Sequence, residues 1–212
     1  GVKLKLPGLR QVQGTVRIPL FPLRTVLFPG GLLPLKVFEQ RYIAMTKTCL
    51  AEDRPFGVCL ITRGDEVSRP GAGAAPEFAQ VGTLARITAW DMPQLGILHV
   101  AAEGATRFRV ERHGVEASGL VVADVVPIAA EPPVVMDAAR APLARLLELI
   151  AARVGAHQFP ARQDYADASW VGYRLAELLP LPLPIKQSML EVNDAGVRLA
   201  VLQKFLADQG LL

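Results

Sequence analysis

The feature that most constrains the fold is an apolar stretch over residues 18–42 that four prolines interrupt. Proline has no amide hydrogen and restricts the residue before it to extended geometry, so this stretch excludes a continuous helix. What remains is a set of short extended segments. We therefore predict strands over residues 16–20, 26–28 and 32–37, with a turn at Pro29-Gly30-Gly31 between the second and the third.

The hydrophobic period changes after this stretch. Tyr42, Met45 and Cys49 share one face of a predicted helix over residues 39–50. Residues 56–62 are a short apolar run rich in β-formers and predict a strand. Residues 63–77 are rich in Gly, Ala and Pro and predict a mobile loop. This loop contains an Arg-Gly-Asp triplet, which we interpret as loop sequence because three residues match a motif by chance often.

The next part of the chain alternates between strand and turn patterns. Strands are predicted over residues 80–90, 96–103, 106–113 and 119–126, with turns at 91–94, 104–105 and 113–114. This spacing is typical of an antiparallel barrel or sandwich. Together with the opening strands, it predicts a compact β-rich lobe.

Everything beyond Glu131-Pro132-Pro133 has a helical period. Apolar stripes over residues 143–154 and 171–179 predict two helices that each face a core, and Pro184 is well placed to begin a third. The last helix has two apolar lines and is predicted to be buried on two sides; the lines are Val197, Val201 and Phe205, and Leu199, Leu202 and Leu206. The prediction is an α+β chain with a loose arm over residues 1–14, a β-rich lobe over 15–130 and a helical lobe over 131–212.

Composition excludes several classes of protein. The 212 residues are 51% hydrophobic and 20% charged, which is typical of a globular protein rather than a disordered one. Neither a run of eighteen apolar residues nor a secretory signal is present, so we expect no membrane span and a cytoplasmic location. Cys49, Cys59 and the three histidines lack the spacing of metal ligands, so we expect no metal and no cofactor. A catalytic triad could be assembled from Ser118, His113 and Asp124, but a triad is recognised only by its geometry and we do not expect one here.

The charge pattern is weak support for nucleic-acid binding. The net charge of +3 comes from 23 basic and 20 acidic residues that are interspersed. Arg107 and Arg109 alternate with Phe108 and Val110, so a strand would place both arginines on one face. That face is either solvated, which we favour, or a polar anchor for another chain.

The apolar opening stretch also contains candidate binding residues. Phe21, Phe28 and Leu33 are each expected in the core, but any of them left exposed would form a patch able to hold unfolded polypeptide. With Arg107 and Arg109, they are the candidate binding residues of the chain.

Several segments, in order, resemble the Lon protease amino-terminal domain family. These are IPLFPL, the LFPG turn and LPLKVFE near the start, then VGTLARI at 81–87, EGATRFRV at 103–110, LLPLPLPIKQSMLE at 178–191 and RLAVLQKFL at 198–206. The resemblance implies an amino-terminal pseudo-barrel of the PUA-like kind followed by an α-helical lobe.

The resemblance also implies a function. The chain has no GxxxxGK[ST] phosphate loop, and the family's catalytic Ser and Lys belong to a domain beyond this one, so we expect a non-catalytic polypeptide-binding module. Its expected partners are unfolded or extended polypeptides and, if it acts as an adaptor, a separate ATP-dependent protease. A groove between the lobes or an open strand edge would take the polypeptide. RNA binding through the PUA-like barrel is the alternative, and a hydrolase is a third hypothesis without a nucleophile motif.

Overall fold

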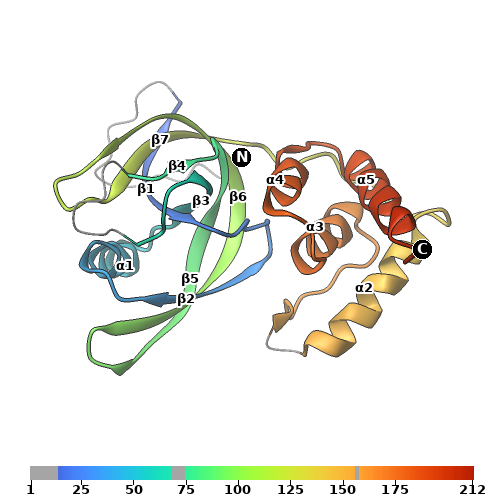
Figure 1. Cartoon of the computed structure of the whole chain (residues 1–212), viewed down its shortest axis with the longest axis horizontal. Helices are drawn as coiled ribbons and strands as arrows, with labels where there is room; N and C mark the ends of the chain where they lie inside the picture. The colour runs from blue at the N-terminus through green and yellow to red at the C-terminus, as the bar shows by residue number, and fades with distance from the viewer. Residues whose placement is uncertain (1–13, 68–74, 156–157) are drawn as a thin grey trace.

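The computed structural model describes residues 14–67, 75–155 and 158–212, and its α+β organisation confirms the predicted fold class (Figure 1). The predicted arm lies almost wholly outside these residues, as does part of the predicted loop. The strands are β1 (Val16–Leu23), β2 (Leu32–Val37), β3 (Phe56–Arg63), β4 (Glu77–Phe78), β5 (Val81–Gln94), β6 (Ile97–Val115) and β7 (Val121–Pro127). The helices are α1 (Gln40–Glu52), α2 (Ala141–Val154), α3 (Ala168–Leu178), α4 (Leu183–Glu191) and α5 (Ala195–Asp208).

The strands close into a barrel. The order is β1-β7-β6-β5-β3, and a parallel pairing between Leu20–Leu23 of β1 and Gly57–Leu60 of β3 completes the circle. Closure removes most exposed strand edges, which is how antiparallel sheets avoid edge-to-edge association. β2 pairs with the first part of β6, and there β5 and β6 continue as a long arm (Figure 1).

Two predictions near the prolines and glycines are wrong, one of a strand and one of a turn. Residues 26–28 are buried but not a strand, because Val26 and Phe28 pack toward the helices while Leu27 packs into a different apolar cluster. The predicted turn at 104–105 lies inside a continuous β6. Gly104 marks a close backbone approach instead, since a Cβ there would lie 2.2 Å from the carbonyl oxygen of Phe28.

Two other predicted turns are displaced along the chain. The predicted turn at 91–94 belongs to β5, and the chain turns at Leu95 and Gly96, where Gly96 has a φ of +83°. The predicted turn at 113–114 likewise lies within β6, and the chain turns at residues 117–118. Cross-strand pairing therefore extends past the residues that usually end strands.

The helical lobe follows its predicted stripes on one side only. Leu143 and Leu147 of α2, and Leu199 and Leu202 of α5, are buried in a common cluster. The prediction that α5 is buried on two sides is wrong. In its other apolar line Val197 is 50% and Val201 42% exposed, and only Phe205 packs partly against the cluster, because α5 packs mainly on α3. In the described part of the chain, no helix combines the length and apolar character needed to cross a bilayer.

The two lobes share one apolar cluster. It contains Val26, Phe28, Leu60 and Val81 from the barrel side together with residues of α2 to α5. The ring of Phe28 lies 5.8 Å from that of Tyr173, and Arg174 donates to the carbonyl oxygen of Pro29 at 2.8 Å. The junction between the lobes is therefore filled with side chains.

Candidate functional site

A concave site lies in a groove beside α1. Figure 1 shows α1 on the side of the barrel away from α2–α5. α1 packs through Tyr42, Ile43, Met45 and Cys49, as its predicted apolar face requires. The groove lies between α1, β1 and β7 and has a volume of about 750 Å³. That volume is within the range of ligand-binding pockets. A binding groove between the lobes, or at an open strand edge, stays a prediction.

The surface of the groove is mainly apolar, and polar side chains are also among its lining residues. Apolar lining comes from β1, β7 and the middle of α1, and includes Pro19, Ala44, Met45, Leu120 and Val122. The polar lining residues are Arg17, Gln40, Arg41, Thr48, Glu52, Arg54, Glu116 and Ser118. Such a lining suits an apolar side chain and the polar backbone that carries it.

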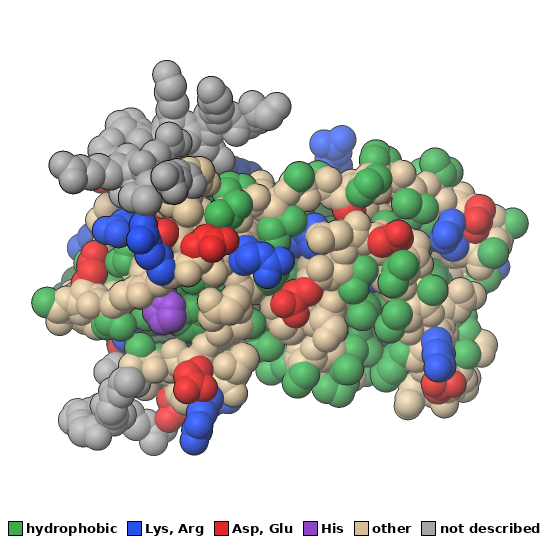
Figure 2. Space-filling model, turned by 90° about the horizontal axis from the view of Figure 1, so that it is seen from above, with side chains coloured by type: hydrophobic (Ala, Val, Ile, Leu, Met, Phe, Trp, Pro, Cys, Tyr) green, Lys and Arg blue, Asp and Glu red, His purple; other side chains and the backbone are tan. Residues whose placement is uncertain are grey.

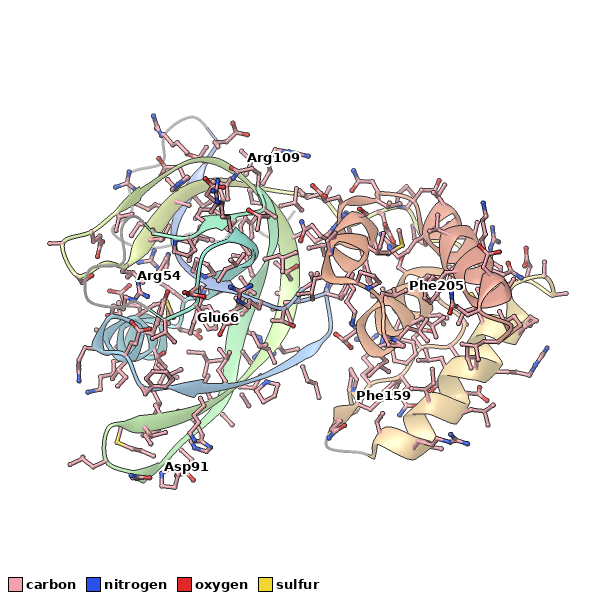
Figure 3. The ribbon with its side chains drawn as sticks, in the orientation of Figure 1. Arg54, Glu66, Asp91, Arg109, Phe159 and Phe205 are labelled. Carbon is pink, nitrogen blue, oxygen red and sulfur yellow. The ribbon has the colours of Figure 1, made fainter. Side chains whose placement is uncertain are left out.

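Two of the groove's arginines are held by the protein itself. Arg41 donates to Glu39 at 3.0 Å and to the carbonyl oxygen of Gly119 at 2.9 Å, which connects α1 to the β6–β7 turn. Arg54 donates to Glu52 at 2.8 Å and to the carbonyl oxygen of Arg17 at 3.3 Å. Figure 3 shows Arg54 beside α1. These bonds fix the ends of the groove.

The third arginine of the groove, Arg17, is more open. Its Nε donates to Asp124 at 3.1 Å, and Arg112 donates to the other oxygen of the same carboxylate at 2.7 Å. Hydrogen bonds from Arg17 and Arg112 lower the pKa of Asp124 below its usual value. Two cations thus share one nearly buried anion, and the Arg17 side chain is 56% exposed.

The groove holds no activated nucleophile among its lining residues. Cys49 is buried at its wall, and burial raises the pKa of the thiol to about 11, so the thiol is protonated at neutral pH. Asp124 bonds to two arginines, and the His113 ring lies 4.8 Å from that of Phe78. The catalytic triad that Ser118, His113 and Asp124 could have formed is therefore not assembled. Within the described residues, no three potential metal ligands cluster. The groove can bind, but it has no evident chemistry.

The apolar candidate residues are core residues. Phe21, Phe28 and Leu33 are all buried, and the ring of Phe21 stacks on that of Tyr42 with centroids 3.9 Å apart. They do not form an exposed patch, so the alternative in which they bind polypeptide at the surface is corrected. Phe21 and Leu33 lie in a cluster with residues of α1, whereas Phe28 lies in the cluster shared with α2–α5.

The two candidate arginines have different environments. Arg107 is buried, which contradicts the solvated face predicted for it; it donates to the carbonyl oxygen of Leu190 at 2.8 Å and to Asn193 at 2.8 Å. The end of α4 covers this part of β6. Arg109 is exposed and lies at the top of the barrel in Figure 3. Arg107 is thus an anchor within the chain.

The sequence reasoning missed an exposed apolar arm. Trp90 is 57% and Leu95 92% exposed near the end of the β5–β6 hairpin, and Phe38 at the end of β2 is also exposed. Asp91, labelled in Figure 3, shows how far this hairpin projects from the barrel. Trp90 and Leu95, close to the turn at Gly96, could have indicated an apolar hairpin tip, but the predicted turn began four residues too early in the sequence.

Charge is mixed over the surface. On the face seen in Figure 2, Lys, Arg, Asp and Glu side chains are interspersed, and apolar side chains cover much of the helical half. A basic stripe of the kind that follows a phosphate backbone is not formed on that face.

Comparison with known proteins gives one family. A family model described as the ATP-dependent protease La (LON) substrate-binding domain matches residues 17–208. The crystal structure of a Lon N-terminal domain protein from Xanthomonas campestris is 35% identical, with a TM-score of 0.72, and the alignment covers 89% of this chain and 98% of that one. The N-terminal domain of Mycobacterium avium complex Lon protease has a similar fold, with a TM-score of 0.62 at 16% identity over 91% of this chain and 99% of that one.

Similar curated proteins are much longer. Lon protease 2 of Myxococcus xanthus is 36% identical over 106 residues, which are 49% of this chain and 12% of that protein. Protein cereblon of Danio rerio is 30% identical over 112 residues, which are 51% of this chain and 24% of that protein. The chain therefore matches at most about a quarter of the length of these relatives.

Proposed function

This chain belongs to the ATP-dependent protease La (LON) substrate-binding domain family, and we propose that it binds unfolded or extended polypeptides without catalysis. The observation that carries the proposal is the open groove beside α1, which has a mainly apolar surface with polar side chains among its lining residues. Apolar surface supplies affinity without requiring a particular sequence, as a receptor for many unfolded chains needs. The exposed Trp90 and Leu95 offer further apolar contact.

The absence of chemistry in the groove supports binding rather than turnover. Its thiol is held protonated by burial, and Arg41 and Arg54 bond to carboxylates and backbone carbonyls of the protein. An adaptor in the cytoplasm that delivers bound polypeptide to a separate ATP-dependent protease is the finer form of the proposal. It rests on the family and on the Lon proteases among the relatives.

RNA binding is the weaker alternative. It rested on the PUA-like barrel and on the basic net charge, with Arg107 and Arg109 as the residues whose change would test it. Arg107 bonds to groups inside the protein, so of these two arginines of β6 only Arg109 is exposed. RNA binding would predict a steep loss of affinity with salt and a loss on Arg109→Gln.

The test is fluorescence anisotropy with a labelled, permanently unfolded polypeptide. Ala44→Trp places a large ring in the groove from the exposed surface of α1, so it should weaken binding several-fold without unfolding the protein. Ala207→Trp is the matched control, because Ala207 is an exposed position of α5 away from the groove. Absence of binding by the wild type at high micromolar polypeptide would reject the proposed function. Equal binding by both variants would reject the groove as its location.

A further inference from the structure

The groove beside α1 has one cation whose hydrogen-bonding capacity is only partly used. The Nε of Arg17 donates a hydrogen bond to Asp124, and its two terminal nitrogens make no hydrogen bond among the described residues. Arg41 and Arg54, by contrast, each direct several nitrogens to partners in the protein. A guanidinium offers five donors in a fork that matches a carboxylate. Arg17 therefore presents unused donors at the wall of an apolar groove.

The charges around Arg17 sum to zero once Glu116 is included, so an added anion would be recognised by the unused donors of Arg17 rather than by excess charge. Asp124 is almost fully enclosed and is shared with Arg112, so this group of three side chains carries a net charge of +1. Glu52 is paired with Arg54, and Glu39 with Arg41, so these pairs are neutral. The opposing charge in the groove lining is Glu116. Glu116 interacts electrostatically with Arg17 and brings the local charge to zero, so an anion bound by the unused donors of Arg17 would compete with Glu116.

The apolar part of the groove lies next to this cation. Pro19 follows Arg17 by two residues on β1, and Val122 pairs with Pro19 across β7. Side chains two residues apart on a strand point to the same face. A ligand that places an apolar side chain on Pro19 and Val122 thus has its neighbouring residue within reach of Arg17.

From these observations we propose that the groove prefers extended segments in which a large apolar residue adjoins an acidic one. Arg17 is the residue that makes this selection, through a charge-assisted hydrogen bond to the acidic side chain. This preference rests on the proposed polypeptide-binding function and adds the substrate class to it.

The experiment compares short fluorescein-labelled peptides that are blocked at both ends and differ at one residue after a Phe: Glu, Gln or Lys. The Glu peptide should bind roughly two- to fivefold more tightly than the Gln peptide, the effect that an exposed ion pair supports, and the Lys peptide should bind most weakly. Arg17→Gln should abolish the difference between Glu and Gln, since Arg112 still holds Asp124. Glu116→Gln should enlarge it.

Arg86→Gln is the matched control, because Arg86 is a similarly exposed arginine in a surface pair with Glu103 on another part of the barrel. It should leave the peptide ranking unchanged, and thermal melts would show that each variant is folded. Equal binding of the Glu and Gln peptides, or a preference that survives Arg17→Gln, would overturn the inference while unfolded polypeptide still binds. Failure of every peptide and of the unfolded polypeptide would overturn the proposed function as well.

Discussion

Arg107 and Arg109 lie two residues apart on β6, but only Arg107 bonds to the helical lobe. Arg107→Met should destabilise the protein by about 3 kcal/mol, because it leaves buried acceptors at the end of α4 without a donor. Arg109→Met should change the free energy of unfolding by less than about 0.5 kcal/mol, as most exposed substitutions do. Urea denaturation of both variants gives the two values. Equal values would show that Arg107 contributes no more than a surface arginine.

Glu131 provides a pH-dependent prediction at the same scale. It accepts hydrogen bonds from Arg198 at 2.6 and 2.9 Å and from Ser169 at 2.6 Å. Burial alone would raise the pKa of Glu131, but these bonds outweigh it and lower the pKa. A carboxyl group with a lowered folded-state pKa stabilises the protein above its unfolded-state pKa, and the stabilisation is lost as pH falls through the folded-state value.

Glu131→Gln should therefore cost about 3 kcal/mol at pH 7, because Arg198 is left as a buried cation without its counter-ion. The difference in unfolding free energy between wild type and variant, called the gap below, should narrow below about pH 4, near the ordinary pKa of a glutamate. Denaturant unfolding at a series of pH values measures the gap. Glu103→Gln, in an exposed pair, should show a small and nearly constant difference. A Glu131→Gln gap that stays constant with pH would contradict the assigned pKa direction.

The burial of these residues could be predicted only in part from the local sequence. The alternation that placed Arg107 and Arg109 on one face is a local property of a strand. Whether another lobe covers that face depends on residues more than eighty positions away, such as Leu190 and Asn193. Phe21, Phe28 and Leu33 were expected in the core because apolar residues usually are, and they lie there.

The β5–β6 arm makes a prediction at the scale of the element. Trp90→Ser combined with Leu95→Ser should weaken the binding of unfolded polypeptide several-fold, since both side chains are exposed and apolar. Stability should change little, because neither side chain is part of a buried cluster. Anisotropy and thermal melting measure the two effects. Val197→Ser with Val201→Ser on α5 is the control for general loss of apolar surface, and an equal loss of binding there would remove the arm from the proposed function.

Elements were predictable where the signal was local and periodic. The helices of residues 141–154 and 168–178 follow their apolar stripes, and β2 has the bounds that its flanking residues indicate. Strand ends were less predictable, because β6 runs through Gly104 and β5 through Pro93 by pairing with neighbours. The groove beside α1 was not predictable, since it arises from how α1 sits on β1 and β7 rather than from any motif.

At the scale of the molecule, the shared apolar cluster implies that the lobes unfold together. Phe28 comes from the barrel side but packs with Tyr173 of α3, and it is fully buried. If the cluster makes one cooperative unit, the slowest-exchanging amides of β3 and of α3 should report the same free energy of opening. Hydrogen exchange resolved by amide measures both in one experiment.

Phe28→Ala distinguishes one cooperative unit from two. Removing a buried phenylalanine costs about 3–5 kcal/mol, and a single unit should lose this amount equally in β3 and α3. Phe21→Ala is the matched variant, because Phe21 packs against Tyr42 of α1 and Phe56 of β3 within the barrel lobe and belongs to a different cluster from α2–α5. In a single unit it too should lower the protection of α3. Protection of α3 that is unchanged by Phe21→Ala would show that the helical lobe is stable independently, and the two lobes would then be separate units joined at Arg107 and Phe28.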